Sequence, residues 1–254
     1  MVDLPIIGVL GGMGPYAGLD LVKKVFAETR GDSDQGHLPV ALLSYSHRIA
    51  DRTDYVLGRT AENPGHAIAE VAHDLASIGV RIAGIPCNSA HEPVIFGVIT
   101  RSLADTDLRI PHLIDETVQH IRELLPSVQR IGCLSTLSVH RTGLYRDAVK
   151  AAGLTPIMCD DHVAEHVVHC AIYDHEWGIK AHSSPVTPRA QELVLEGIRH
   201  VRERGAEAVI LGCTELPLAV SKAEGVVCVD PVRALARALI RETSPSKLKP
   251  LCRD

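Results

Sequence analysis

The sequence repeats itself once, at a nearly constant spacing of 124 to 126 residues. Ile7-Gly8 near the start corresponds to Ile131-Gly132. Three later pairs recur in the same order: Gly18 and Gly143, Gly79 and Gly205, and Cys87 and Cys213. Four pairs of residues whose spacing varies so little are not expected by chance. The sequence therefore predicts two copies of one structural unit.

Each half alternates short apolar runs with amphipathic segments of helical length. The apolar runs predict buried strands at 6–10, 40–45, 81–86, 110–114, 130–134, 208–211 and 226–229. The amphipathic segments predict helices at 16–30, 65–77, 139–152, 188–204 and 232–242. Strands that alternate with helices favour parallel sheets built from βαβ units. The tail from Ser244 is the one obviously loose segment.

We therefore expect an α/β protein with two pseudo-symmetric, doubly wound parallel-sheet domains and the active site between them. The first domain is expected to comprise residues 1–114 and a returning segment, 226–254, and the second domain residues 115–225. The returning segment is placed there because Val229-Asp230-Pro231 resembles Ile114-Asp115, which lies at the end of the first half.

Composition excludes several classes of function. The net charge is −5, which is opposite to the basic surface that nucleic-acid binding requires, and aromatic residues make up only 3% of the chain. The amino-terminal segment MVDLPIIGVLGG has no basic region, and its apolar run is far shorter than the ~20 residues of a membrane span. We expect a cytoplasmic protein that binds neither nucleic acid nor membrane.

Cys87 and Cys213 each lie just past the end of a predicted strand, where the chain turns into a helix. Backbone N–H groups and the helix dipole can stabilise a thiolate there, and ligands of open α/β sheets bind at this edge. Two such thiols facing each other suit the inversion of a carbon centre, which needs a base on one face and an acid on the other. The alternative is that both are inert, buried small residues.

The remaining thiols lack this setting. The cysteine count of seven is odd and no secretory signal is present, so a disulfide framework is not expected. The other five are expected to be packing residues: Cys133, Cys159, Cys170, Cys228 and Cys252.

The sequence resembles the cofactor-independent aspartate/glutamate racemases over nearly its whole length, and within them the aspartate-racemase branch. The motifs that carry the resemblance begin at Gly8 (GVLGGMGP), Asp34 (DQGH), Asp51 (DRTDYVLG), Pro86 (PCNSAH) and Gly212 (GCTE). The paired cysteine motifs together with Asp51-Arg52-Thr53 are the specific part, because a glycine loop alone is common.

The resemblance implies an amino-acid racemase that acts on aspartate, glutamate or both without a cofactor. It implies that Cys87 and Cys213 are the two acid/base residues and that Arg52 and Lys180 bind substrate carboxylates. It further implies that Asn88, Ser89 and Thr214 hold the α-carboxylate or amino group. Thr136 is expected to bind substrate as well, and we expect a homodimer. The chain departs from the branch after the fifth predicted strand, where Thr136-Leu-Ser-Val139 replaces a Thr-x-Gly-Thr turn.

Four other interpretations stay open. Gly11-Gly12-Met13-Gly14 suggests a phosphate-binding loop but lacks the GxGxxG spacing. His162, Glu165 and His166 match an HxxEH zinc pattern, although a solvated helix face explains them as well. A decarboxylase or cis/trans isomerase of the same superfamily would typically need one of the two cysteines. A catalytically silent binding protein would hold the amino acid without exchanging its α-hydrogen.

Overall fold

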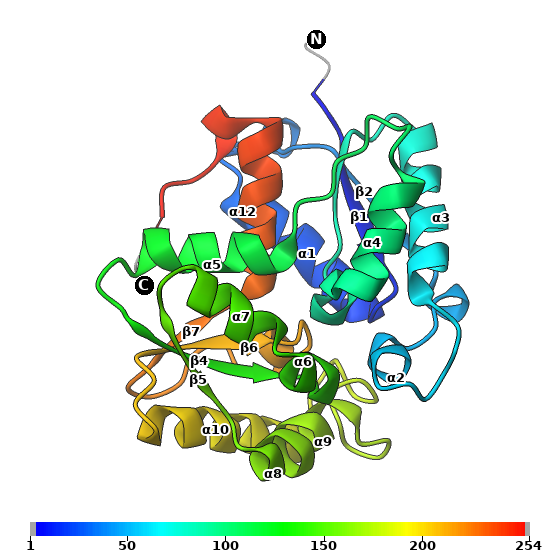
Figure 1. Cartoon of the computed structure of the whole chain (residues 1–254). Helices are drawn as coiled ribbons and strands as arrows, with labels where there is room; N and C mark the ends of the chain where they lie inside the picture. Colours follow the sequence, from blue (N-terminus) through cyan, green and yellow to red (C-terminus); the bar gives the residue numbers. More distant parts are fainter. Residues whose placement is uncertain (1–3, 252–254) are drawn as a thin grey trace. The chain divides into compact units, whose positions relative to one another are not determined.

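The computed structural model describes residues 4–251 of the chain, so Cys252 lies outside the described residues. The chain forms two compact units, 1–116 with 232–254 and 117–231. Each unit contains its own parallel sheet with helices on its faces, which confirms the expected α/β class with two parallel-sheet domains (Figure 1). None of the helices in the described part is long and apolar enough to cross a bilayer.

The first unit has a three-stranded sheet with the order β2-β1-β3. Its strands are β1 (Ile7–Gly11), β2 (Val40–Ser44) and β3 (Ile82–Gly84). Its helices are α1 (Pro15–Glu28), α2 (Arg52–Val56), α3 (Pro64–Ser77), α4 (Pro93–Ser102) and most of α12 (Pro231–Thr243), with short 3-10 turns η1 (Asp34–Gly36), η2 (Ser46–Arg48), η3 (Asn88–His91) and η5 (Pro245–Lys247).

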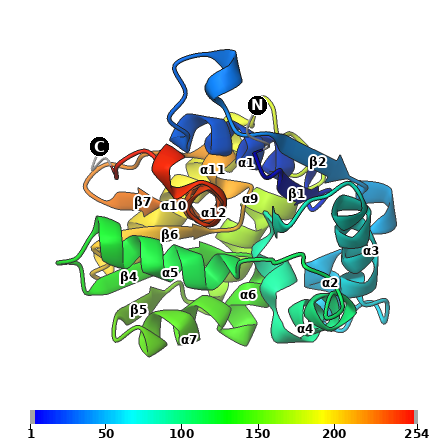
Figure 2. The same cartoon turned by 90° about the horizontal axis from the view of Figure 1, so that it is seen from above.

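Apolar side chains fill both faces of this sheet. Ile7 and Val9 belong to a core cluster with residues of α1 and α12, whereas Leu10 belongs to one with residues of α3 and α4. Alternate residues of β1 thus serve opposite faces, as in a doubly wound sheet. Figure 2 shows α3 and α4 together on one side of the strands and α12 on the other.

The second unit has a four-stranded sheet with the order β5-β4-β6-β7. Its strands are β4 (Arg130–Ser135), β5 (Thr155–Met158), β6 (Ala208–Gly212) and β7 (Val227–Val229). Its helices are most of α5 (Leu113–Leu124), then α6 (Leu137–Thr142), α7 (Leu144–Ala151), α8 (Asp161–Val163), the π-helical η4 (Ala164–His169), α9 (Cys170–Tyr173), α10 (Pro188–Glu203) and α11 (Leu216–Ala219).

The two sheets share one connectivity, which explains the sequence repeat. β1 pairs with β2 and β3, and β4 pairs in the same way with β5 and β6. Gly8 pairs with Ala83 in the first sheet, and Gly132 pairs with Val209 in the second. An added Cβ at Gly8 would lie 2.7 Å from Val80, so the repeated glycine allows close packing beneath the sheet.

The strand expected at 110–114 is wrong. Only Arg109 bridges to β3, through Ile82, and α5 already begins at Leu113. Pro111 lacks an N–H group for a ladder, and the buried residues Ile114, Val118 and Ile121 recur at helical spacing.

Two further expectations need correction. The helix expected at 139–152 is divided into α6 and α7 by Gly143, whose φ of 78° is left-handed. The described part of the tail, residues 244–251, is not loose, because Leu248 bridges to Thr29 and Lys249 donates its N–H to the Glu28 carbonyl.

The returning segment begins later than the expected residue 226. β7 pairs with β6 as the last strand of the second sheet, and the division between the units falls after Pro231.

Candidate active site

Cys87 lies in the first unit, three residues after β3 ends, and is the N-cap of η3. Its side chain is almost fully buried in the cluster that also contains Met13, Ile49 and Ala90. Because η3 has only four residues, the support that we expected from a helix dipole reduces to nearby backbone N–H groups.

His91 fixes the backbone of Cys87. Its Nδ1 lies 2.9 Å from the Cys87 carbonyl oxygen, and because a carbonyl oxygen only accepts, Nδ1 carries the hydrogen. The ring stacks on Phe96 and meets the ring of His112 edge-on. Burial, and next the proximity of His112, lower the pKa of His91 to about 3. A neutral His91 supports the loop and supplies no positive charge to the thiol.

Arg52 is the first residue of α2, a short helix that packs against η3. The helix starts here because the Asp51 carboxylate accepts hydrogen bonds from the N–H groups of Thr53 and Asp54, at 2.8 and 3.0 Å. Arg52 itself is buried, and its Nη1 donates to the Ala50 carbonyl at 3.1 Å. The helix that begins with Arg52 is thus held close to the segment that follows Cys87.

Asn88 and Ser89 open η3 and are both buried. The first unit therefore brings together four of the expected site residues, since Cys87, Asn88 and Ser89 are consecutive and the helix of Arg52 packs on them.

Cys213 lies in the second unit, directly after β6. Its Sγ donates a hydrogen bond to Glu215 Oε2 at 2.9 Å, and Thr214 Oγ1 donates to the same oxygen at 3.3 Å. Burial, and next the Glu215 carboxylate, raise the pKa of Cys213 well above its usual range, whereas Lys180 acts in the opposite direction. This reverses our expectation of a stabilised thiolate at Cys213.

Lys180 reaches the same carboxylate from the segment after α9. Its Nζ donates to Glu215 Oε1 at 3.1 Å and lies 5.1 Å from the centre of the Tyr173 ring. The backbone of this segment turns tightly, and a Cβ at Gly178 would lie 2.5 Å from the Asp174 carbonyl oxygen. Glu215 therefore links Lys180, Thr214 and Cys213.

Thr136 follows β4 and is the N-cap of α6. Ser135 pairs with Gly212, so Thr136 and Cys213 follow at the same edge of the sheet. The hydroxyl oxygens of Thr136 and Ser138 lie 3.1 Å apart, and both residues are buried. Ser138 stands where the aspartate-racemase branch has the glycine of its Thr-x-Gly-Thr turn, and it contacts Thr136, the first threonine of that turn.

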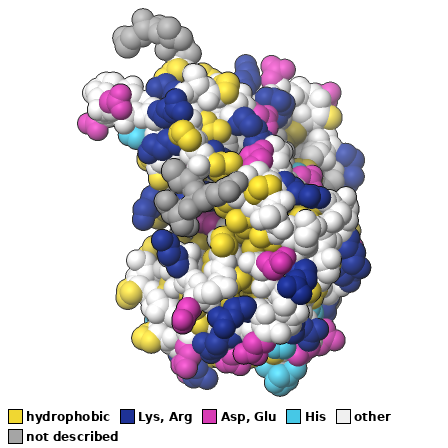
Figure 3. All heavy atoms as spheres, turned by 90° about the vertical axis from the view of Figure 1, so that its left-hand side faces the viewer, with side chains coloured by type: hydrophobic (Ala, Val, Ile, Leu, Met, Phe, Trp, Pro, Cys, Tyr) yellow, Lys and Arg dark blue, Asp and Glu magenta, His cyan; other side chains and the backbone are white. Residues whose placement is uncertain are grey.

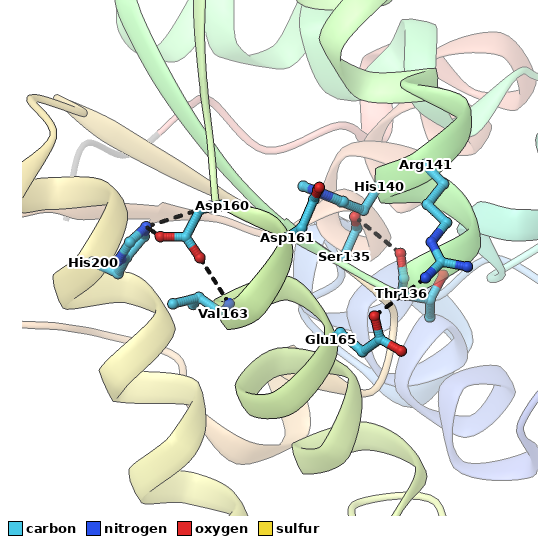
Figure 4. A network of polar contacts seen from close by, with 9 residues as sticks. All are labelled: Ser135, Thr136, His140, Arg141, Asp160, Asp161, Val163, Glu165 and His200. Atoms are coloured by element: carbon cyan, nitrogen blue, oxygen red, sulfur yellow. Dashed lines mark hydrogen bonds and ion pairs between the residues drawn. The ribbon is translucent and has the colours of Figure 1, made fainter.

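Polar contacts hold the helix after Thr136 in place (Figure 4). Arg141 donates to Glu165 at 3.2 Å, and His140 contacts Asp161 at 3.1 Å, which joins α6 to the α8–η4 segment. Nearby, Asp160 caps α8 at the N–H of Val163 and contacts His200 on α10.

The HxxEH spacing does not form a metal site here. The rings of His162 and His166 lie 4.8 Å apart, but Glu165 is paired with Arg141. Among residues 4–251, no three or more His, Cys, Asp or Glu side chains gather so that they could hold a metal ion.

The main residue that sequence reasoning missed is Glu215. It stands in the GCTE motif, which gives its residue type but not the direction of its side chain. The repeat offered one signal that this position is special, because the corresponding residue, two positions after Cys87, is Ser89 and not an acid.

Comparison with known proteins shows the family. Residues 10–239 match the model of the Asp/Glu/Hydantoin racemase family. The chain belongs to this family. The similarity in fold extends over most of the chain: an aspartate racemase from Picrophilus torridus superposes with a TM-score of 0.79 at 26% identity, covering 96% of both chains.

Two other comparisons find similar proteins. An aspartate racemase homologue from Pyrococcus horikoshii shares the fold, with a TM-score of 0.70 at 20% identity over 95% of this chain and 100% of the other. A glutamate racemase from Desulforudis audaxviator is 29% identical over 178 residues, which are 65% of this chain. The match spans 61% of that relative, less than two thirds of its length.

Proposed function

We propose that this racemase-family protein interconverts the enantiomers of an acidic amino acid, aspartate, glutamate or both, with two cysteine thiols and no cofactor. The observation that carries the proposal is the equivalent position of the two thiols. Cys87 follows β3, which pairs with β1, the first strand of its sheet along the chain. Cys213 follows β6, which pairs in the same way with β4. Membership of the family and the 26% identity to an aspartate racemase support the substrate class.

In this mechanism Cys87 and Cys213 act on opposite faces of the substrate Cα. One thiolate removes the α-proton, the electron pair stays on Cα, and the other thiol delivers a proton to the opposite face. Racemisation in the other direction exchanges the two roles. The hard step is to stabilise the carbanion, for which Asn88, Ser89, Thr136 and Thr214 offer hydrogen-bond donors.

Arg52 and Lys180 bind the two substrate carboxylates. The planar guanidinium suits a bidentate contact, and the ammonium supplies a compact charge. Lys180 donates a hydrogen bond to Glu215, so a carboxylate that binds Lys180 has to compete with Glu215.

We further propose that the protein acts in the cytoplasm, as a homodimer, on a small molecule and not on nucleic acid. The net charge of −5 supports the last point. On the face seen in Figure 3, Lys and Arg side chains are interspersed with Asp and Glu side chains.

The decisive experiment is chiral analysis of L- and D-amino acids after incubation with the purified, dialysed protein. We expect each enantiomer of aspartate or glutamate to approach an equal mixture, and Cys87→Ser to abolish this. Release of carbon dioxide without inversion would instead indicate a decarboxylase. Binding of the amino acid without exchange of its α-hydrogen would indicate a silent binding protein.

A further inference from the structure

The two thiol motifs differ at one chemically important position. Two residues after Cys87 the chain has Ser89, whereas two residues after Cys213 it has Glu215. The strands that lead to these motifs are equivalent in their sheets, so the difference lies in the side chains and not in the fold.

Glu215 is buried, with 4% of its side chain exposed, and its two oxygens have different partners. Oε1 accepts a hydrogen bond from Lys180, which favours the ionised carboxylate. Oε2 accepts from the thiol of Cys213 at 2.9 Å. Because an ionised carboxylate only accepts, the hydrogen between these two atoms belongs to the sulfur.

We propose that Glu215 is the positioning residue that holds the proton on Cys213 and presets this thiol as the proton donor of the resting protein. The role of Cys213 in turnover rests on the proposed function, but the control of its ionisation does not. The corresponding residue of the other motif is the neutral Ser89, so that motif offers no carboxylate two residues after its cysteine.

The groups that act on Cys213 come from three places. They are Glu215 in its own motif, Lys180 from the segment after α9, and the buried phenol of Tyr145 on α7, which also interacts with Cys133. Burial raises the pKa of Tyr145, so this phenol stays neutral at ordinary pH. Glu215 and Lys180 are therefore the charges that decide the ionisation of Cys213, and they act in opposite directions.

This arrangement cannot favour one enantiomer overall. Enantiomers have equal free energies, so kcat/KM must be the same in both directions at every pH. Glu215 instead determines the pH at which Cys213 loses its proton. Thiol ionisation is therefore a better readout than the direction of turnover.

The test is the rate at which iodoacetamide alkylates Cys213 between pH 6 and 10, measured by mass spectrometry of its peptide, with the Cys87 peptide as internal reference. The variants are Glu215→Gln, which keeps the size of the side chain but removes the charge, and Lys180→Met. Glu224→Gln is the matched control, because Glu224 is exposed and Arg202 contacts its backbone carbonyl, which the substitution keeps.

We expect Glu215→Gln to speed the alkylation of Cys213 at pH 8 about tenfold or more, since a pKa lowered by one unit gives ten times more thiolate. Lys180→Met should slow it, and Glu224→Gln should leave it unchanged. An unchanged or slower rate in Glu215→Gln would overturn the proposal. Acceleration in both Glu215→Gln and Lys180→Met would also overturn it, because a loosened structure and not charge would then be the cause.

Alkylation requires no turnover, so this result is independent of the racemase assay. The expected rates in a protein that racemises nothing would refute the proposed function and support the role of Glu215. If the protein racemises an amino acid but Glu215→Gln leaves the alkylation rate of Cys213 unchanged, the proposed function would be supported and the role of Glu215 refuted.

Discussion

His91 Nδ1 donates to the carbonyl oxygen of Cys87, 2.9 Å away and four residues earlier in the chain. The contact ties the backbone of a proposed catalytic thiol to a fully buried imidazole that remains neutral. The loop therefore depends on a group that titrates in the unfolded chain but resists protonation in the folded one.

This difference predicts a specific loss of stability in acid. The pKa of His91 is about 3 in the folded protein, below the 6.5 of a free histidine, so between these values the unfolded state binds one more proton. Stability should fall as the pH falls from about 6.5 toward 3. Between pH 7 and 5 this one group costs about 2 kcal/mol.

His91→Asn isolates that effect, because its side-chain amide can donate to the same carbonyl but does not titrate. Urea unfolding at pH 7 and pH 5 should show that the wild type loses about 2 kcal/mol more than the variant. Equal losses in both proteins would show that His91 is protonated as readily when folded as when unfolded.

Arg52 should contribute to the use of acidic substrates. Arg52→Ala removes a charge-assisted contact to a carboxylate, typically ~1.5–3 kcal/mol, and should lower kcat/KM for aspartate and glutamate roughly tenfold to a hundredfold. Arg59→Ala is the matched control, because Arg59 is exposed and pairs only at the surface with Asp54. Unchanged kinetics in Arg52→Ala would remove this residue from the substrate site.

The proposed cofactor independence predicts a distinctive inhibition pattern. Dialysed protein should remain active with EDTA and with hydroxylamine, which traps carbonyl cofactors, but lose activity when its thiols are alkylated. Loss of activity with EDTA that zinc restores would redirect attention to His162 and His166.

The sequence predicted the fold well where local signals and the repeat agreed. The alternation of strands and helices gave both parallel sheets, and the recurrence of Gly8 as Gly132 marked their equivalent first strands. It failed where one residue overrides a pattern. The residues on both sides of Gly143 have the pattern of one helix, but the left-handed φ of Gly143 divides it. The strand β5 was missed because it contains Pro156, which is tolerated at the edge of a sheet but is a poor signal for a strand.

The candidate site was predictable only in part, because motifs give residue types and not contacts. Cys213 and Thr214 were recognisable from their motif, but the direction in which burial and Glu215 move the pKa of Cys213 depends on side-chain geometry. Likewise, the sequence places His91 four residues after Cys87 but does not give the direction of its ring. The structure shows that the ring is completely buried and donates to the Cys87 carbonyl.

The two-thiol mechanism itself makes a prediction about isotope exchange. If Cys87 and Cys213 act on opposite faces of Cα, the proton that the product receives comes from a thiol that has not touched the substrate's proton. In D2O, from either enantiomer, the product should therefore contain solvent deuterium from the first turnovers, while the remaining substrate stays protonated until the reverse reaction begins. Mass spectrometry of the separated enantiomers measures both.

Single substitutions complete this test. Cys87→Ser and Cys213→Ser should each abolish racemisation, because the much higher pKa of a serine hydroxyl makes it a poor base at neutral pH. Each variant should still exchange the α-hydrogen of the one enantiomer whose α-proton faces the remaining thiol, and the two variants should select opposite enantiomers. Full racemisation by either variant, or deuterium in unreacted substrate at the rate of turnover, would show that one thiol serves both faces and that the paired arrangement is not the basis of the reaction.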